Sequence, residues 1–336
     1  MDIRKFALIA GVSTATISRA FSGRGRIKEA TRQRIFDLAA EHGYTPNIHA
    51  QRLNASQTSI IAVYYSFSSA AIFDYYNMEL AQEISKAAGA RGYTVNLELT
   101  QRTEEPSLEL QRAAAGGGLD GIILVADSRE GAVAFLKLFQ TVPVVVIANH
   151  SWVLPEAAGL VRISQDAGIH EAVARLRAAG HARIGFIHGM SDNAKHTAFL
   201  HALRDNGLDP ADAPQAAGPI SFEDGERAIG ELLDAGVTAV LCSTDILALG
   251  AISGADKRGV RVPGDLAIVG IDNLAFSAFT RPPLASVGIP RTEIAEASVS
   301  ILNQLATAPE GDGQQPVRQY IHTINTHYIP RASAGA

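Results

Sequence analysis

The sequence predicts a small all-α head followed by a larger α/β body with two sheets. Three observations carry this prediction. A helix-turn-helix pattern stands near the start of the chain, an alternation of strands and helices begins at Ile60, and charge is divided unevenly. Residues 1–57 contain nine Lys and Arg against four Asp and Glu, whereas the rest contains 20 and 30. A basic head on an acidic body indicates that only the head meets a polyanion.

The helix-turn-helix pattern occupies residues 10–21. Gly11 can adopt the positive φ that ends a helix, and Ser13 can cap the next helix by accepting a backbone N–H bond. The small polar side chains of that helix's first turn, together with Arg19, suit entry into a DNA major groove. The opposite, apolar face consists of Ile17, Ala20 and Phe21. An ordinary capped surface helix is the alternative.

A helix on each side completes the head. Residues 3–10 are predicted to form the first, capped by Asp2, and residues 28–41 the third, ended by Gly43 and Pro46. The third helix offers arginines to DNA phosphates at Arg32 and Arg34. The predicted inward residues of the two helices are Phe6, Ile9, Ala10, Ile35, Leu38 and Ala39.

Residues 47–54 follow the head and leave room for about two turns of helix. Such a short helix is marginal alone in water, so we expect it to order only against a partner helix or DNA. A flexible linker is the alternative interpretation.

From Ile60 onward the pattern predicts mostly parallel β-sheets with helices on both faces. At least seven strand–helix units favour two sheets, whose carboxyl ends would form the two sides of a ligand cleft. The predicted strands are 60–64, 94–99, 121–125, 142–148, 184–188, 239–242 and 266–271. The predicted helices are 75–91, 105–115, 167–180, 193–206, 223–235 and 245–258.

Several classes of protein are disfavoured by the composition of the 336 residues. Cys242 is the single cysteine, so an intrachain disulfide is impossible and a reducing cytoplasm is expected. No apolar run is long enough to span a membrane, and no secretory leader is recognisable. Residues 116–118 lack the Lys-Ser/Thr of a phosphate loop. The histidines show no metal-ligand spacing, and no nucleophile–base–acid set can be assembled, so we predict no metal, no cofactor and no enzyme.

The chain as a whole resembles the lactose/galactose repressor (LacI/GalR) family of bacterial transcription factors. The motifs that carry the resemblance are Ala10-Gly11-Val12-Ser13, Thr16-Ile17-Ser18-Arg19, Thr31-Arg32, Gly43-Tyr44-Thr45-Pro46-Asn47, Leu119-Asp120-Gly121-Ile122-Ile123, Gly180-His181-Ala182-Arg183-Ile184, Gly270-Ile271-Asp272-Asn273, Pro282-Pro283-Leu284-Ala285 and Pro330-Arg331-Ala332-Ser333. Any one motif is weak evidence alone. Because all of them occur in the family's order, the probability of a chance resemblance is very small.

The resemblance implies a domain plan. Residues 1–46 would form the DNA-binding head, 47–58 the hinge helix and linker, and 59–336 a two-lobed, periplasmic-binding-protein-like effector and dimerisation domain. Its N-lobe would comprise about 59–161 and 291–322, and its C-lobe about 162–290 and 323–336. Strands would cross between the lobes near 160–163, 288–291 and 321–325. A homodimer on a pseudo-palindromic operator is implied, which fits the small contact area of a single head.

DNA contacts are implied residue by residue. The positions that match the family's base-reading residues are Thr14, Ala15 and Arg19. Arg can donate to guanine, and Ala can touch a thymine methyl. Leu53 matches a hinge leucine that wedges into the minor groove. Its alternative role, burial in a dimer contact, is compatible with the wedge. The remaining implied contacts, chiefly to the DNA backbone, are Ser13, Thr16, Ser18, Arg32, Tyr44, Asn47 and Ala50.

The implied effector cleft differs from the common family pattern. Lys195 stands where an Arg is usual, Thr244-Asp245 replaces an Asn-Asp pair, and Asn149 follows a strand where a carboxylate is common. Carboxylates and aromatic faces suit a polyhydroxylated ligand. The candidate effector residues are Phe73, Lys195, Phe222, Thr244, Asp245 and Asp272, with Trp152, Arg162 and Asp166 as secondary candidates near the first crossing. A turn residue is the alternative for Asp272, and lobe core for Phe222.

Lys28 is a departure inside the head, at a position where the family usually has a Ser or Thr cap. A Lys forms no capping bond and opposes the helix dipole, so the third helix is expected to begin late or to fray.

The sequence therefore predicts a ligand-responsive regulator, most simply a repressor of carbohydrate uptake or catabolism genes with a sugar or sugar-derivative effector. A regulator that responds to a nucleobase or another metabolite is the first alternative. A transport binding protein of the same fold is the second, and an enzyme the third.

Overall fold

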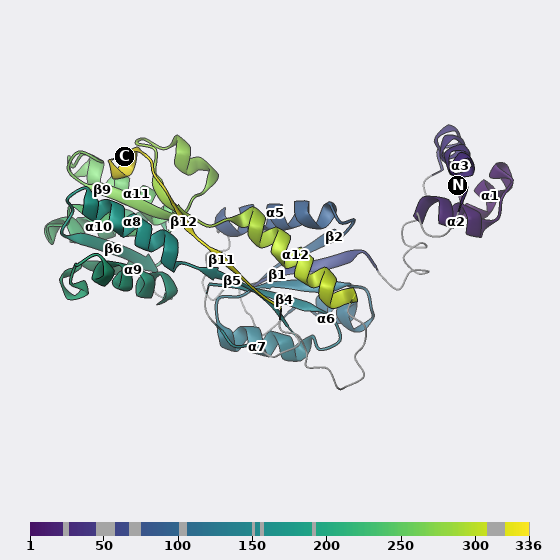
Figure 1. The fold of residues 1–336 in the computed structure, drawn as a ribbon, viewed down its shortest axis with the longest axis horizontal. Helices are drawn as coiled ribbons and strands as arrows, with labels where there is room; N and C mark the ends of the chain where they lie inside the picture. Colours follow the sequence, from purple (N-terminus) through teal and green to yellow (C-terminus); the bar gives the residue numbers. More distant parts are fainter. Residues whose placement is uncertain are drawn as a thin grey trace.

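The structure is a computed structural model that describes residues 1–22, 27–44, 58–66, 75–100, 106–149, 152–154, 158–189, 193–307 and 320–335. It contains the predicted helical head and a body built on two sheets, which are drawn in Figure 1. The hinge predicted at 47–54 lies outside the described residues.

The head contains α1 (Ile3–Ala10), α2 (Thr14–Ser22) and α3 (Glu29–Glu41). Its predicted caps are confirmed. The Asp2 side chain accepts from the Lys5 amide at 2.9 Å, Gly11 ends α1 with φ 63°, and the Ser13 hydroxyl accepts from the Thr16 amide at 3.1 Å. Lys28 makes no side-chain cap bond, and α3 begins one residue after it.

The head's small core is aromatic at its centre. Phe6 is fully buried and stacks on Tyr44, with 4.0 Å between ring centroids. Two predictions about the head are corrected. Ile9 is 43% exposed, because Ala7 faces inward in its place. Arg34, which we expected to face phosphates, donates to the Ala10 carbonyl at 2.7 Å and so satisfies a group at the end of α1.

The first sheet of the body has six strands in the order β11-β5-β4-β3-β1-β2, and all its pairings are parallel. Its strands are β1 (Ile60–Ser66), β2 (Thr94–Thr100), β3 (Gly121–Val125), β4 (Val144–Ala148), β5 (Gly159–Ser164) and β11 (Ile321–Asn325). The central strands β3 and β4 are buried almost throughout, as expected for a sheet covered on both faces.

The second sheet also has six strands, in the order β12-β10-β9-β8-β6-β7, and only the β10–β12 pair is antiparallel. Its strands are β6 (Ile184–Gly189), β7 (Gln215–Gly218), β8 (Ala239–Cys242), β9 (Ala267–Asp272), β10 (Ala285–Gly288) and β12 (His327–Ile329). The prediction of two sheets is confirmed.

Helices cover both faces of each sheet. The first sheet carries α5 (Tyr75–Gly89) and α12 (Arg291–Thr307) on one face and α6 (Leu108–Ala115) and α7 (Arg129–Leu138) on the other (Figure 1). The second sheet packs α8 (Asp166–Ala178) and α9 (Asn193–Asp205) on one face and α10 (Phe222–Asp234) and α11 (Asp245–Lys257) on the other. One continuous apolar cluster, containing Ile84, Val161, Val287 and Phe199, joins both sheets.

The chain passes between the sheets at three places. It leaves the first sheet after β5 to begin α8, returns after β10 to begin α12, and passes from β11 to β12 at Thr326. Crossings were expected from the family resemblance close to these positions. The lobe boundaries that accompany them stay a prediction.

Several elements were absent from the sequence-based prediction. The pattern of residues missed α7, α12 and the strands β5, β7, β10, β11 and β12, although the family resemblance implied crossing strands close to β5, β10 and β11. β7, β10 and β12 have only three or four residues, too few for a clear period-two pattern. No helix among the described residues is long and apolar enough to cross a membrane.

We expect Lys28→Ser to stabilise the head by about 1 kcal/mol, because a Ser hydroxyl can accept the amide bond that Lys28 leaves unmade. Native-state hydrogen exchange of the α3 amides should slow accordingly. Gln33→Ser in the middle of the same helix is the matched control and should not stabilise it. Equal exchange rates in Lys28→Ser and the unaltered chain would contradict the assignment of the cap.

Candidate functional site

The face of α2 that the sequence predicts to read DNA is open to solvent. Thr14, Ala15 and Arg19 are exposed, whereas Ile17 and Ala20 on the opposite side are buried in the head core. The Ser13 and Thr16 hydroxyls lie 2.9 Å apart, and Ser18 is half-buried. The helix therefore presents one arginine and several small side chains, so a flat polar partner such as a base-pair edge can approach its backbone closely.

Two implied DNA contacts have internal roles. Arg32 pairs with Glu29 at 3.3 Å, and its Nε atom is buried without a partner. Tyr44 is only 6% exposed, and burial raises the pKa of its phenol. Tyr44 therefore orients the end of α3 from within the core. Asn47, Ala50 and Leu53 lie outside the described residues.

The predicted effector residues gather at the carboxyl edge of the second sheet. Asp272 ends β9, Thr244 follows β8, and Lys195 stands on the helix after β6. The three strands are neighbours in the order β9-β8-β6, so the topology brings these residues to one edge, as expected for a parallel sheet.

Lys195 and Asp272 form a nearly buried charged pair. The Lys195 Nζ lies 3.7 Å from Asp272 Oδ1, with side chains 10% and 7% exposed. The ammonium also donates to the Ser243 carbonyl at 2.8 Å. Such a pair is stabilised by further hydrogen bonds to its remaining donors and acceptors. It gives the edge one cation and one carboxylate at close range.

Asp245 has a structural role that differs from the effector contact we expected. It is fully buried, and its carboxylate accepts from the Leu274 amide at 2.8 Å and from the hydroxyls of Ser277 at 2.5 Å and Ser286 at 2.7 Å. Burial raises the pKa of this carboxyl, and the hydrogen bonds oppose the rise. Asp245 thus fastens α11 to the loop after β9.

The other candidates are divided. Thr244 caps α11 by accepting from the Leu247 amide at 3.2 Å. Phe222, at the start of α10, is 39% exposed, which favours an accessible aromatic face over the lobe-core alternative. Phe73 lies outside the described residues.

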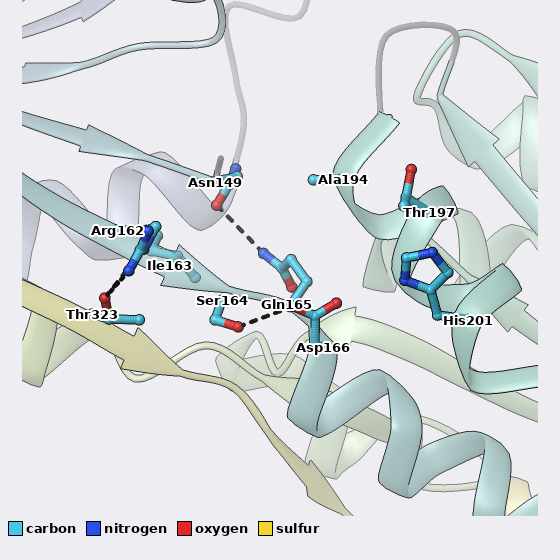
Figure 2. Close-up of a pocket in the computed structure, with 10 residues that line it drawn as sticks. All are labelled: Asn149, Arg162, Ile163, Ser164, Gln165, Asp166, Ala194, Thr197, His201 and Thr323. Atoms are coloured by element: carbon cyan, nitrogen blue, oxygen red, sulfur yellow. Dashed lines mark hydrogen bonds between the residues drawn. The ribbon is translucent and has the colours of Figure 1, made fainter. Parts of the chain in front are cut away.

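A cavity of about 660 Å³ lies between the carboxyl ends of β4 and β5 and the outer face of α9 (Figure 2). Its volume falls within the range of small-molecule sites. Among described residues it is lined by Asn149, Arg162, Ile163, Ser164, Gln165, Asp166, Ala194, Thr197, His201 and Thr323. The Lys195–Asp272 pair is not part of this lining, although Lys195 directly follows the lining residue Ala194.

The cavity's polar groups are held in place by the crossings. Both Nε and Nη2 of Arg162 donate to the Thr323 hydroxyl, at 3.1 and 2.7 Å. Gln165 is 3% exposed and its Oε1 is buried without a partner, while its amide nitrogen lies 3.4 Å from Asn149 Oδ1. Figure 2 shows Thr197 and His201 on the opposite wall.

Sequence reasoning ranked these residues too low. Arg162 and Asp166 were secondary candidates, and Gln165, Thr197 and His201 were not considered. A usable signal existed, because 194, 197 and 201 share one face of the helix. Polar residues directly after a parallel strand, as at 164–166, are a second signal.

The described residues offer no group of three or more His, Cys, Asp or Glu side chains that could hold a metal ion. Cys242 is fully buried, and burial raises the pKa of its thiol far above its usual range. This thiol therefore remains protonated and is a poor nucleophile or ligand.

Comparison with known proteins identifies the family. Residues 2–47 match the model of bacterial regulatory proteins of the lacI family, and residues 173–334 match a periplasmic binding protein-like domain. The HTH-type transcriptional repressor CytR of Escherichia coli (strain K12) is 32% identical over 321 residues, covering 93% of this chain and 92% of CytR. The chain belongs to the LacI family.

Solved structures agree with this membership. A complex of the transcriptional regulator CelR with cellobiose superposes with a TM-score of 0.70 at 25% identity, covering 99% of each chain. The lac repressor dimer bound to operator and the anti-inducer ONPF gives a TM-score of 0.77 at 24% identity, covering 100% of this chain and 99% of that one, which shows the shared fold.

Membership establishes the general function. This LacI-family chain is a DNA-binding transcriptional regulator and not an enzyme, as the sequence predicted. A bacterial transcription regulator acts where the chromosome lies, which agrees with the predicted cytoplasmic location.

We expect Asp245→Ala to lower the free energy of unfolding by about 3 kcal/mol, because three buried donors lose their charged acceptor. Urea unfolding followed by circular dichroism measures this loss. The matched control is Asp256→Ala, which removes an exposed carboxylate from the same helix. A fully stable Asp245→Ala protein would return Asp245 to the list of effector contacts.

Proposed function

We propose that this LacI-family regulator binds a pseudo-palindromic operator as a homodimer and responds to a sugar or sugar derivative in the inter-lobe cleft. The observation that carries the proposal is the pairing of an exposed, arginine-bearing recognition helix with a polar cavity between two lobes. A lac repressor structure of the same fold is described as a dimer bound to operator, which supports the assembly.

The head supports sequence reading by α2. Thr14, Ala15 and Arg19 would approach base edges, and the Ser13 and Thr16 hydroxyls would meet phosphates at the start of the helix, where the dipole is positive. One head offers little contact area, so two heads on a two-fold site supply affinity and specificity together. Leu53 would wedge between bases in the hinge.

The cleft supports a polyhydroxylated effector. Asn149, Asp166 and Thr197 supply both donors and acceptors to the cavity, and a sugar needs both at several hydroxyls. Asp272 and Lys195 supply a carboxylate and an ammonium nearby, while Phe222 offers an accessible aromatic face. The CelR structure contains cellobiose, which supports a carbohydrate for this fold.

A nucleobase or another non-sugar metabolite is the second candidate. A planar base stacks on aromatic rings, whereas the described cavity lining contains one ring, that of His201. That lining therefore favours a hydroxyl-rich ligand.

The two sites would communicate through the lobes. A ligand that closes or opens the cleft changes the relative position of the N-lobes in the dimer, and thereby the spacing of the hinges. Because the coupling is a free energy, effector and operator alter each other's affinity by the same factor. Repression of carbohydrate genes is the simplest output, and the same linkage applies whether the effector releases the operator or strengthens its binding.

We expect Arg19→Ala to weaken binding to the specific operator by about 1–3 kcal/mol if Arg19 donates to a guanine. The operator is obtained by selection from random DNA with the full-length protein, and binding is then compared on selected and scrambled duplexes. The control is Arg112→Ala, because Arg112 is an exposed residue of α6 in the body. Equal losses on both duplexes would mean that Arg19 contacts phosphate.

We expect Asp272→Ala to weaken binding of the sugar effector about tenfold or more, because a hydroxyl of the sugar would lose its hydrogen-bond partner. Calorimetry against neutral sugars, sugar acids and nucleosides identifies the effector first. Lys195→Ala should weaken a sugar acid more than a neutral sugar, because only the acid gains a charge-assisted bond.

Asp265→Ala is the control for Asp272→Ala, since that carboxylate is paired with Arg261 at the surface and its pKa is lowered to about 2 by that partner. Unchanged effector affinity in Asp272→Ala would remove Asp272 from the site. A purine as the strongest ligand in the panel would overturn the sugar assignment and leave the DNA-binding function intact.

A further inference from the structure

The turn that ends β9 has an uncommon backbone. Asp272 has φ 117° and Asn273 has φ 52°, although neither is glycine. Residues with a side chain occupy this region only where surrounding contacts hold them there. Those contacts therefore decide where the Asp272 carboxylate points.

Arg291 holds the two carbonyls of the turn, while Arg331 and Ser286 bond to Asn273. Its Nη1 donates to the Asp272 carbonyl at 2.6 Å and its Nη2 to the Asn273 carbonyl at 2.8 Å. The side chain is 14% exposed. A planar guanidinium can bridge two adjacent carbonyls in this way, whereas a lysine ammonium cannot match the fork geometry.

Glu79 holds Arg291 from within the same lobe, and both residues reach the turn of the second sheet. It stands on α5, which packs against α12 beside the first sheet (Figure 1). Glu79 Oε2 lies 2.9 Å from Arg291 Nη2, and Glu79 Oε1 accepts from the Ala275 amide at 3.0 Å. Ala275 lies three residues beyond Asp272, so one carboxylate touches both the arginine and the loop that follows the turn.

An aromatic contact reinforces this junction. The ring of Tyr75, on the first turn of α5, meets the ring of Phe276 edge-on, with 5.7 Å between centroids. Phe276 follows Ala275 in the short 3-10 helix Ala275–Phe279, which comes after β9 of the second sheet. The contact between α5 and this loop is therefore both polar and apolar.

We propose that Arg291 is a positioning residue for Asp272, and that Glu79, which pairs with Arg291 in one lobe and accepts from Ala275 in the other, ties the orientation of this carboxylate to the relative placement of the lobes. The inference rests on the proposed effector role of Asp272. When the lobes separate, Glu79 leaves the Ala275 amide and Arg291 leaves the two carbonyls, so the turn relaxes. A ligand that fixes Asp272 favours the arrangement in which Glu79 reaches across, because linkage is reciprocal.

The first test measures the lobes directly and needs no effector. Nitroxide labels at Lys137→Cys on α7 and Arg204→Cys on α9 report the distance between the lobes by pulsed electron resonance, and the fully buried Cys242 stays unlabelled. Glu79→Ala should lengthen and broaden the distance distribution. If Glu79→Ala does not fold, the same distance is measured in Glu79→Gln.

The matched control is Glu83→Ala. Glu83 lies one turn further along α5, and within the described part of the chain it bonds to Lys86 at 2.6 Å and to Thr292 at 3.1 Å, both on helices of its own lobe. The distance distribution of Glu83→Ala should equal that of the unaltered chain. A Glu79 variant with an unchanged distribution would overturn the proposed tie between the lobes.

The second test addresses the positioning of Asp272. Arg291→Lys keeps the charge opposite Glu79 but gives up the two-carbonyl bridge. Hydrogen exchange of the Asn273 and Leu274 amides should then become about tenfold faster, the factor expected for one lost charged hydrogen bond, while the label distance changes little. Exchange as slow as in the unaltered chain would overturn the positioning role.

These outcomes are separable from those of the proposed function. Both measurements are made on the full-length protein without ligand, so they can succeed or fail whatever the effector is. Conversely, an effector that ignores Asp272 would overturn the sugar-site proposal and leave the measured tie between α5 and the β9 turn standing.

Discussion

The close packing of the three crossings is the constraint on which the rest of the body depends. Thr326, 2% exposed, links two of them: its hydroxyl donates to the Ser164 or Gln165 carbonyl at 3.1 and 3.2 Å and accepts from the Gly168 amide at 3.3 Å. A Cβ at Gly168 would stand 2.5 Å from Val287 Cγ1 and 2.7 Å from the Thr326 hydroxyl. No side chain fits there without displacing a neighbouring crossing. The cavity is built directly beside this point.

This location has a mechanical consequence. Residues that line the cavity from the side of the first sheet, such as Arg162 and Gln165, are themselves part of a crossing or follow it directly. Rotation of one lobe against the other must therefore change their distance to Thr197 and His201 on α9. A ligand that bonds to both walls favours one rotation over the others by its differential contacts.

Two carboxylates at the same sheet edge illustrate how burial separates structural from binding roles. Asp245 is enclosed and has three hydrogen-bond donors from its own lobe, so little capacity remains for a ligand. Asp272 lies 3.7 Å from the Lys195 ammonium, on a backbone that Arg291 holds. Both residues are Asp at the carboxyl edge of one sheet, and only the surrounding contacts distinguish them.

The head and the body meet different physical demands. The head has few buried residues, and stacked aromatic rings at Phe6 and Tyr44 supply much of the apolar area in a small volume. This arrangement leaves the whole outer face of α2 to polar and small side chains. The body buries far more surface and can accommodate charged pairs inside it.

The sequence by itself determined the head, its capping residues, the two parallel sheets and the family. These features depend on local rules: Asp2, Gly11 and Ser13 act within a few residues of their partners, and the period of apolar residues follows from helix and strand geometry. The same rules failed for Ile9 and for strands of three or four residues, because neighbouring elements decide their environment.

Only the tertiary structure decided the composition of the cleft. Asp245 and Asp272 look alike in sequence, yet one is enclosed by Ser277 and Ser286 and the other is set by an arginine nineteen positions away. The cavity joins residues from β5, β11, α8 and α9 with Asn149, which directly follows β4. The crossings bring these distant residues together, and the burial of each side chain there depends on every element packed around that side chain. No local pattern in the chain therefore encodes the composition of the cleft.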